Sequence, residues 1–259
     1  MISPEAERRI ARILLGLDTA GTGLQDIESI LLLARVLEAE LTALFIEDDD
    51  LLRSAALPFT TEIPLSGGDA RALDVARLER SLRHLARRME AELAQAAERA
   101  QVRWAFRILR GRRLPTLLAE AGVEDLLVLA RTPHSTAEAR QAAQAHTVAV
   151  VFDGSDSARH AVALAARLVG QDGHDLLLLD VAPAGKGLDV RAARQWLLER
   201  GIPATRRTLS ELTAGRLLEA LRGNVPLLLI LPADHPAITT PGFIDRLRRH
   251  LPSPLALLR

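Results

Sequence analysis

Short apolar segments alternate along the chain with longer segments whose apolar residues recur at helical spacing. In the first half, the strand-like runs are residues 12–17, 41–46, 102–109 and 125–130. The helix-like segments are residues 24–37, 73–100 and 114–121, where apolar residues stand three and four positions apart. Parallel strands need crossover connections, and helices usually supply them. The pattern therefore predicts an α/β protein with a parallel sheet covered by helices.

The same pattern then begins again. Residues 164–169 (Leu-Ala-Ala-Arg-Leu-Val) repeat the helical run of residues 32–37 (Leu-Leu-Ala-Arg-Val-Leu). The strand-like runs of the second half are residues 148–152, 176–181, 204–209 and 227–231. So many matching elements in one order indicate two divergent copies of one plan. We predict repeat one at residues 1–142 and repeat two at residues 143–259.

The two predicted repeats end differently. Repeat two has room for a helix at residues 240–250 and a fifth strand at residues 254–258, whereas repeat one has room only for a helix at residues 136–145. Without a fifth strand, the apolar run 125–130 would be an exposed sheet edge, which is an aggregation hazard. Either the helix at residues 136–145 or the terminal strand could cover this edge. We favour the terminal strand, reaching across from repeat two.

Residues 148–169 carry a family resemblance. They read Val-Ala-Val-Val-Phe-Asp-Gly-Ser-Asp-Ser-Ala-Arg-His-Ala-Val-Ala-Leu-Ala-Ala-Arg-Leu-Val. A hydrophobic strand ending in Asp-Gly-Ser, followed by an Ala- and Leu-lined helix, resembles the opening of a universal stress protein domain. Residues 12–37 resemble a weaker version, with Asp18-Thr19-Ala20 in place of Asp153-Gly154-Ser155.

This resemblance implies a Rossmann-like, five-stranded open parallel sheet in the order 3-2-1-4-5, with helices on both faces. It also implies dimeric packing, or a tandem chain that mimics the dimer as an intramolecular pseudo-dimer. In the ATP-binding members, nucleotide lies at the carboxyl ends of the strands and the Asp after the first strand faces the adenine. Asp18, Asp153, Gly154 and Ser155 are therefore the candidate nucleotide-binding residues. The alternative is that each Asp only caps the following helix.

The phosphate-binding loop departs from the family pattern. The resemblance implies Gly-x-x-Gly-x9-Gly-[Ser/Thr] after the fourth strand, where glycines let backbone N–H groups approach phosphate. Residues 131–136 contain no Gly, and residues 232–236 read Pro-Ala-Asp-His-Pro. Proline removes backbone donors, and Asp234 would place a carboxylate where phosphate would lie. We predict a non-catalytic regulatory or adaptor protein with impaired ATP binding. The alternative is a stress-response protein that binds ATP or AMP through an atypical phosphate loop.

Other polar clusters have alternative interpretations. Asp48, Asp49 and Asp50 could hold a hard cation together with Asp18, but a solvated acidic loop is the favoured interpretation and no metal site is predicted. Ser155 and His160 lie one helical turn apart without a nucleophile elbow or an orienting acid, so no hydrolase and no other enzyme is predicted.

Two Arg clusters complete the candidates. Arg110, Arg112 and Arg113 could bind an anion or an acidic partner, or form a solvated turn. Arg246, Arg248 and Arg249 are expected on the outer face of the C-terminal helix.

The composition argues against nucleic-acid-binding and membrane-spanning proteins. The 259 residues include no Cys and no Tyr, and 33 basic residues balance 33 acidic residues. This composition argues against a nucleic-acid partner. Residues 1–10 are charged, and no apolar run approaches the roughly 20 residues of a membrane span, so we expect a cytoplasmic protein without a membrane partner. A homodimer or a protein partner remains possible.

Overall fold

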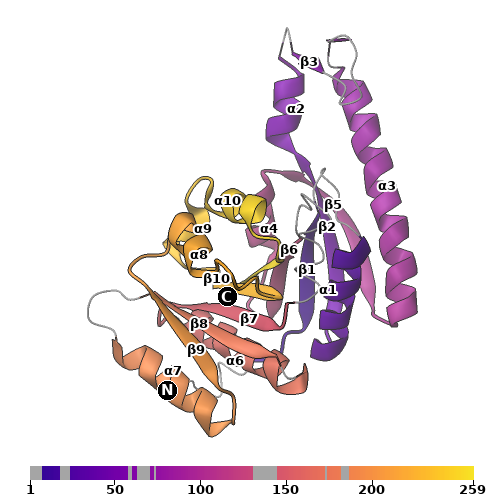
Figure 1. Ribbon diagram of the computed structural model, residues 1–259. Coiled ribbons are helices and arrows are strands. Elements are labelled where there is room, and N and C mark those ends of the chain that lie inside the picture. The colour runs from indigo at the N-terminus through magenta and orange to yellow at the C-terminus, as the bar shows by residue number, and fades with distance from the viewer. Residues whose placement is uncertain are drawn as a thin grey trace.

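Nine strands form a single sheet, and helices cover both of its faces (Figure 1). The computed structural model describes residues 8–17, 24–57, 60–62, 71–72, 74–130, 145–172, 174–181 and 187–259. The strands of the sheet are β1 (Arg12–Leu17), β2 (Glu40–Asp48), β5 (Trp104–Gly111), β6 (Asp125–Leu129), β7 (Thr147–Phe152), β8 (Asp175–Val181), β9 (Ala204–Leu209), β10 (Leu228–Pro232) and β11 (Leu255–Leu258). The helices are α1 (Leu24–Leu37), α2 (Asp49–Ala55), α3 (Val75–Ala100), α4 (Arg113–Glu120), α6 (Asp156–Asp172), α7 (Gly187–Glu199), α8 (Ala214–Ala220), α9 (Pro236–Thr239) and α10 (Phe243–His250).

The sheet order is β5-β2-β1-β6-β11-β10-β7-β8-β9. Counted within each half of the chain, the first half has the order 3-2-1-4 and the second half has the order 3-2-1-4-5. Strands within each half are parallel, whereas β6 and β11 are antiparallel. The predicted fold class is confirmed, and the two expected sheets are joined edge to edge into one. Because the halves run in opposite directions, their carboxyl ends lie at opposite edges of this sheet.

The terminal strand β11 joins the two halves. It pairs with β10 on one side, Leu229 opposite Leu255, and with β6 on the other, from Leu255 opposite Leu129 to Leu258 opposite Leu126. The prediction that this strand covers the apolar edge of residues 125–130 is confirmed. The other candidate cover, residues 136–145, lies almost entirely outside the described residues.

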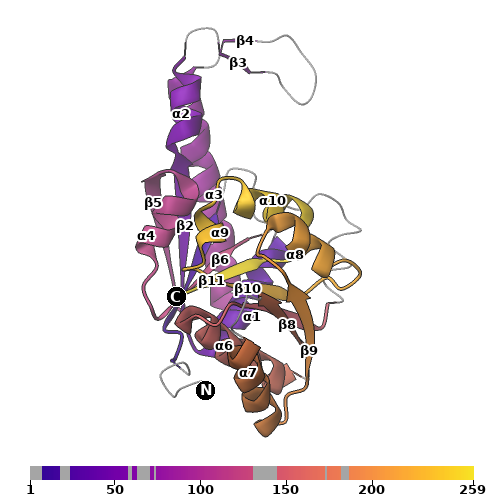
Figure 2. The same ribbon diagram turned by 90° about the vertical axis from the view of Figure 1, so that its left-hand side faces the viewer.

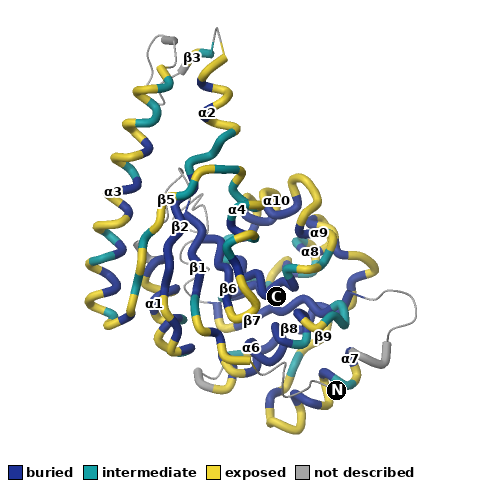
Figure 3. The backbone as a smooth tube through the Cα atoms, turned by 180° about the vertical axis from the view of Figure 1, so that it is seen from behind, coloured by how far each residue is buried: buried dark blue, intermediate teal, exposed yellow. Residues whose placement is uncertain are grey.

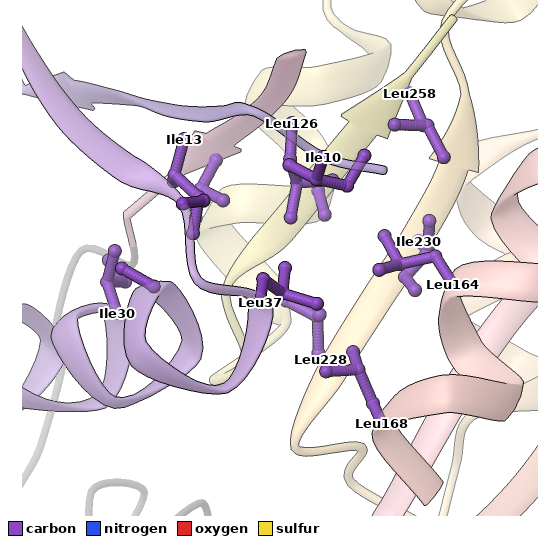
Figure 4. Close-up of a cluster of buried hydrophobic side chains, with 14 of the residues drawn as sticks. Ile10, Ile13, Ile30, Leu37, Leu126, Leu164, Leu168, Leu228, Ile230 and Leu258 are labelled. Atoms are coloured by element: carbon purple, nitrogen blue, oxygen red, sulfur yellow. The ribbon is translucent and has the colours of Figure 1, made fainter. Parts of the chain in front are cut away.

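The core continues from one half into the other. Alternate residues of the buried strands point to opposite faces, so one face packs against α1, α3, α6 and α7 and the other against α4, α8, α9 and α10. Figure 3 shows that the central strands are buried along their length. Figure 4 shows Ile13 and Ile30 from the first half in one cluster with Leu164, Ile230 and Leu258 from the second.

A helical arm projects from the first half, beyond the edge of the sheet (Figures 1 and 2). It consists of α2, the small β3–β4 pair (Thr61–Glu62 and Arg71–Ala72) and the first half of α3. The sequence predicts a helix at residues 73–100, which agrees with α3, but no helix is predicted at the position of α2. Asp48 caps α2 by accepting a hydrogen bond from the Asp50 N–H at 2.9 Å.

Arg248 does not lie on the outer face of the C-terminal helix, as the sequence analysis expected. It is only 9% exposed, and its Nε and Nη2 atoms donate to the Ala130 carbonyl oxygen at 3.3 and 3.1 Å. The guanidinium thus supplies hydrogen bonds to the end of β6, where the ladder stops. Arg248 is therefore a contact between the halves, while its neighbour Arg249 is exposed as predicted.

Candidate functional site

The candidate site in the second half is a shallow hollow at the carboxyl ends of its strands. It has a volume of about 470 Å³. Its lining residues are Asp153, Val181, Ser210, Glu211, Leu212, His235, Ala237 and Thr240. Asp153 follows β7 and His235 follows β10. These two strands are neighbours at the topological switch point of the second half, where the connections from successive strands lead to opposite sides of the sheet. Open α/β sheets bind ligands at this position, and we call it the strand-end hollow.

The Asp153-Gly154-Ser155 turn is held by its own side chains. The Asp153 Oδ1 atom accepts hydrogen bonds from the Ser155 N–H at 2.9 Å and from the Ser155 hydroxyl at 2.5 Å. The Ser155 Oγ atom accepts from the Ala158 N–H at 3.1 Å, which makes Ser155 the N-cap of α6. Gly154 has φ +81°, a left-handed conformation that favours glycine. The helix is thus capped by Ser155, whereas Asp153 fixes the turn and lines the hollow.

This capping role gives a direct prediction for Ser155. Ser155→Ala removes the acceptor for the Ala158 N–H and should lower the free energy of unfolding by about 1 kcal/mol. Urea denaturation of both proteins measures the difference. Ser155→Thr keeps a hydroxyl at the cap and should lie close to wild type. Equal losses in both variants would contradict a capping role.

The loop after β10 satisfies its own backbone donors. The His235 Nδ1 atom accepts from the Ala237 N–H at 3.1 Å, so His235 is the N-cap of the short helix α9. Pro236 follows as the first helical residue and has no N–H to offer. In the sequence, His235 belongs to the degenerate loop after the fourth strand, and a capping role was not predicted for it. The sequence signal for its capping role is its position directly before a Pro at the start of a helix.

The charges around the strand-end hollow are unfavourable for phosphate. Asp153 and Glu211 line it, and among the residues that the structure describes no Lys or Arg does. The Arg216 Nε atom lies 3.2 Å from Glu211, outside the lining, and the Arg259 Nε atom lies 4.0 Å from Asp234. These two described Arg side chains are therefore directed at carboxylates of the protein.

The equivalent candidate in the first half, Asp18, lies outside the described residues. The strand before it, β1, is antiparallel to β7 because the pairing reverses once between them, at β6 and β11. The end of β1 and the end of β7 therefore face opposite edges of the sheet. The structure does not bring these two strand ends into one site.

Ser155 and His160 do not bond to each other. Ser155 is engaged at the cap, while the buried His160 ring places Nδ1 3.1 Å from the Arg259 carbonyl oxygen and Nε2 3.3 Å from the Arg8 carbonyl oxygen. His160 thus connects the segment before β1 with the end of β11. These contacts of His160 are structural, and Ser155 and His160 do not form the geometry of a nucleophile and a base.

The acidic and basic loops of the first half pair with each other. Asp49 accepts from the Arg110 Nε atom at 2.9 Å, and Asp50 accepts from the Arg112 Nε atom at 3.1 Å. The hydrogen bond to Asp49, supported by the charge of that carboxylate, raises the pKa of Arg110. Both clusters remain largely exposed, as the solvated interpretation expects, but the sequence analysis did not predict that they pair with each other. The sequence signal is that β2 and β5 are neighbours, which places their ends side by side.

Within the part of the chain that the structure describes, no group of three or more His, Asp or Glu residues is arranged to hold a metal ion. The possible partner of Asp48, Asp49 and Asp50, which is Asp18, is not among these residues.

Comparison with known proteins rests on the fold. No family model matches the sequence, and no curated protein matches it. A universal stress protein from Archaeoglobus fulgidus DSM 4304 matches with a TM-score of 0.61 and 14% identity, over 95% of this chain and 96% of that chain. The chain has the universal stress protein fold.

Two further structures with this fold span nearly the whole chain. A functionally unknown protein from Pseudomonas aeruginosa PAO1 matches with a TM-score of 0.52 and 9% identity, over 99% of this chain and 94% of that one. A putative universal stress protein from Pseudomonas aeruginosa UCBPP-PA14 matches with a TM-score of 0.50 and 9% identity, over 98% of this chain and 94% of that one.

Among the described helices, none is long and apolar enough to cross a bilayer.

Proposed function

We propose that this chain is a universal-stress-protein-like regulatory or adaptor protein that catalyses no reaction and binds ATP weakly or not at all. The observation that carries the proposal is the His235-capped loop after β10. Its Ala237 N–H is occupied by the His235 side chain, Pro236 has no N–H, and Asp234 adds a negative charge. A phosphate group bound after β10 would need free backbone N–H donors or cations. The described lining of the strand-end hollow instead includes the carboxylates of Asp153 and Glu211.

Thermal unfolding with and without Mg-ATP tests this proposal. A ligand that binds only the folded state adds RT ln(1 + [L]/Kd), which is below about 0.1 kcal/mol when its concentration is a tenth of Kd. We therefore expect no measurable shift of Tm at submillimolar ATP.

Two variants make the ATP experiment specific. Asp153→Ala removes the carboxylate in the strand-end hollow, and Asp156→Ala removes one that is 99% exposed on α6. A clear Tm increase with ATP in the wild type that disappears in Asp153→Ala but persists in Asp156→Ala would overturn the proposal. It would support the alternative, a protein that binds ATP or AMP through an atypical phosphate loop. The position of Asp153 in the hollow is the observation that favours this alternative.

The adaptor part of the proposal is supported by the helical arm. The arm projects from the body and has no counterpart among the described elements of the second half (Figure 2). Arg80, His84 and Arg87 are exposed on α3 and have no ion-pair partner among the described residues. We propose that the two halves act as one intramolecular pseudo-dimer and that the arm is the surface available to a protein partner.

A further inference from the structure

A separate cavity lies on the helical face formed by α6 and α7 and shares no lining residue with the strand-end hollow. Its volume is about 270 Å³. The lining residues come from the segment before β1 (Arg8, Ile10), from α6 (Ala163, Leu164, Ala166, Arg167), from α7 (Trp196) and from the turn before β9 (Arg200, Ile202). The cavity therefore joins both halves of the chain.

The floor of this cavity is apolar. Ile10, Leu164 and Ile202 are buried at 1%, 5% and 9% exposure, and the Trp196 ring is 8% exposed. Figure 4 shows Ile10 and Leu164 in one cluster of buried hydrophobic side chains. A preformed apolar surface of this size suits a small ligand body, because ligand sites are mostly apolar with a few convergent polar groups.

The rim of the cavity is entirely basic. Within the described part of the chain, its charged lining residues are Arg8, Arg167 and Arg200, and no Asp or Glu lines it. Arg8 and Arg167 form no ion pair within the described residues. The Arg200 guanidinium carbon stands 3.9 Å from the centroid of the Trp196 ring, a cation–π contact that holds it over the floor. In a chain whose formal net charge is zero, three guanidinium groups around one apolar hollow form a local anion site.

We propose that this cavity binds a small amphipathic anion, a carboxylate or monophosphate head group on a short apolar body. The head group would accept hydrogen bonds from Arg8 and Arg167, since guanidinium groups pair with carboxylate and phosphate oxygens in a bidentate manner. The apolar body would lie on the floor beside Trp196. Because the lining comes from both halves, the bound ligand would stabilise the contact between them. This inference does not depend on whether the strand-end hollow binds nucleotide.

Intrinsic fluorescence gives a local readout, because the chain has only 2 Trp residues. Trp104→Phe on the edge strand β5 leaves Trp196 as the single fluorophore. We expect octanoate to change the Trp196 emission saturably and to raise Tm, whereas uncharged 1-octanol should do neither at the same concentrations. Octyl phosphate, tested in the same way, distinguishes a carboxylate site from a phosphate site, and binding of either anion supports the proposal.

Charge variants in the Trp104→Phe background locate the binding. Arg167→Gln and Arg8→Gln should each weaken octanoate binding about fivefold or more, because each removes a charged hydrogen-bond donor. Arg249→Gln, an exposed Arg on α10 away from the cavity, should leave it unchanged. The proposal is overturned if neither anion gives a saturable change, if 1-octanol binds as tightly as octanoate, or if Arg167→Gln and Arg8→Gln both behave like Arg249→Gln.

Discussion

Removing residues 255–259 is expected to abolish cooperative folding of the whole chain, although only the last strand is lost. All four residues of β11 are at most 1% exposed, and they pair with β10 on one side and β6 on the other. Loss of a single buried Leu costs about 2–5 kcal/mol, and a domain has only about 5–15 kcal/mol of stability. Three leucines and two rows of backbone hydrogen bonds disappear together. The deletion should therefore give an aggregating protein with two exposed apolar edges.

A milder variant keeps this prediction measurable if the deletion does not fold. Leu257→Ala should lower the free energy of unfolding by about 2–5 kcal/mol, while Leu198→Ala, on a side chain that is 57% exposed, should stay within about 0.5 kcal/mol of wild type. Amide hydrogen exchange in Leu257→Ala should rise in both β6 and β10. If exchange rises only in β10, β11 does not support the first half, and its joining role is wrong.

Much of the sheet could be predicted from sequence because buried parallel strands are continuous apolar runs. The missing fifth strand was visible as missing length after residue 130, and the exposed edge it implied pointed to β11. α2 was missed because its seven residues, Asp-Asp-Leu-Leu-Arg-Ser-Ala, are too few to show a helical period. Its stability comes from Leu52 and Ala55, which are buried in the arm, and that packing is a tertiary effect.

The chemistry of individual side chains was less predictable because it depends on neighbours distant in sequence. The partner of Arg248 is a carbonyl group 118 residues away. A signal was present, since Arg248 is four positions after Ile244 and thus shares the inner side of α10, but an Arg among other Arg residues suggested solvent. Asp153 and His235 were both located at the correct strand ends. The capping residues could not be predicted in the same way, because capping depends on local geometry. Ser155, rather than Asp153, caps α6, and His235 caps α9.

A partly buried ion pair joins the amino-terminal ends of β1 and β6, with the Asp125 side chain buried and the Arg12 side chain 36% exposed. Arg12 and Asp125 are directly opposite each other in the β1–β6 register. The Arg12 Nε and Nη2 atoms donate to the two carboxylate oxygens of Asp125 at 3.0 and 2.6 Å, and the Gly122 N–H donates to Oδ2 at 2.8 Å. The Asp125 side chain is 8% exposed. Burial alone would raise the pKa of Asp125, but the hydrogen bonds from Arg12 and Gly122 and the charge of Arg12 outweigh it, so the pKa is lowered.

The direction of this shift sets the pH dependence of stability. The unfolded pKa of Asp is about 3.9, and the folded pKa of Asp125 lies below its ordinary value. The pair therefore contributes its full stability above the unfolded pKa and loses it as the pH falls through the folded pKa. Asp125→Asn should lower the free energy of unfolding at pH 7 by about 2 kcal/mol, because it leaves Arg12 without its charge partner.

Urea denaturation of wild type and Asp125→Asn across the acidic range tests this prediction. The difference in unfolding free energy between them should be constant from neutral pH down to about pH 5. It should shrink below about pH 4, where Asp125 takes up a proton in the unfolded chain, until the folded carboxylate is protonated at lower pH. Glu38→Gln is the matched control, because the Arg9–Glu38 pair has a similar 3.0 Å contact but side chains that are 64% and 72% exposed. An exposed pair contributes about 0–1 kcal/mol, so this variant should stay close to wild type at every pH. A difference between wild type and Asp125→Asn that persists unchanged at low pH would show that the carboxylate is important for its shape and hydrogen bonding rather than for its charge.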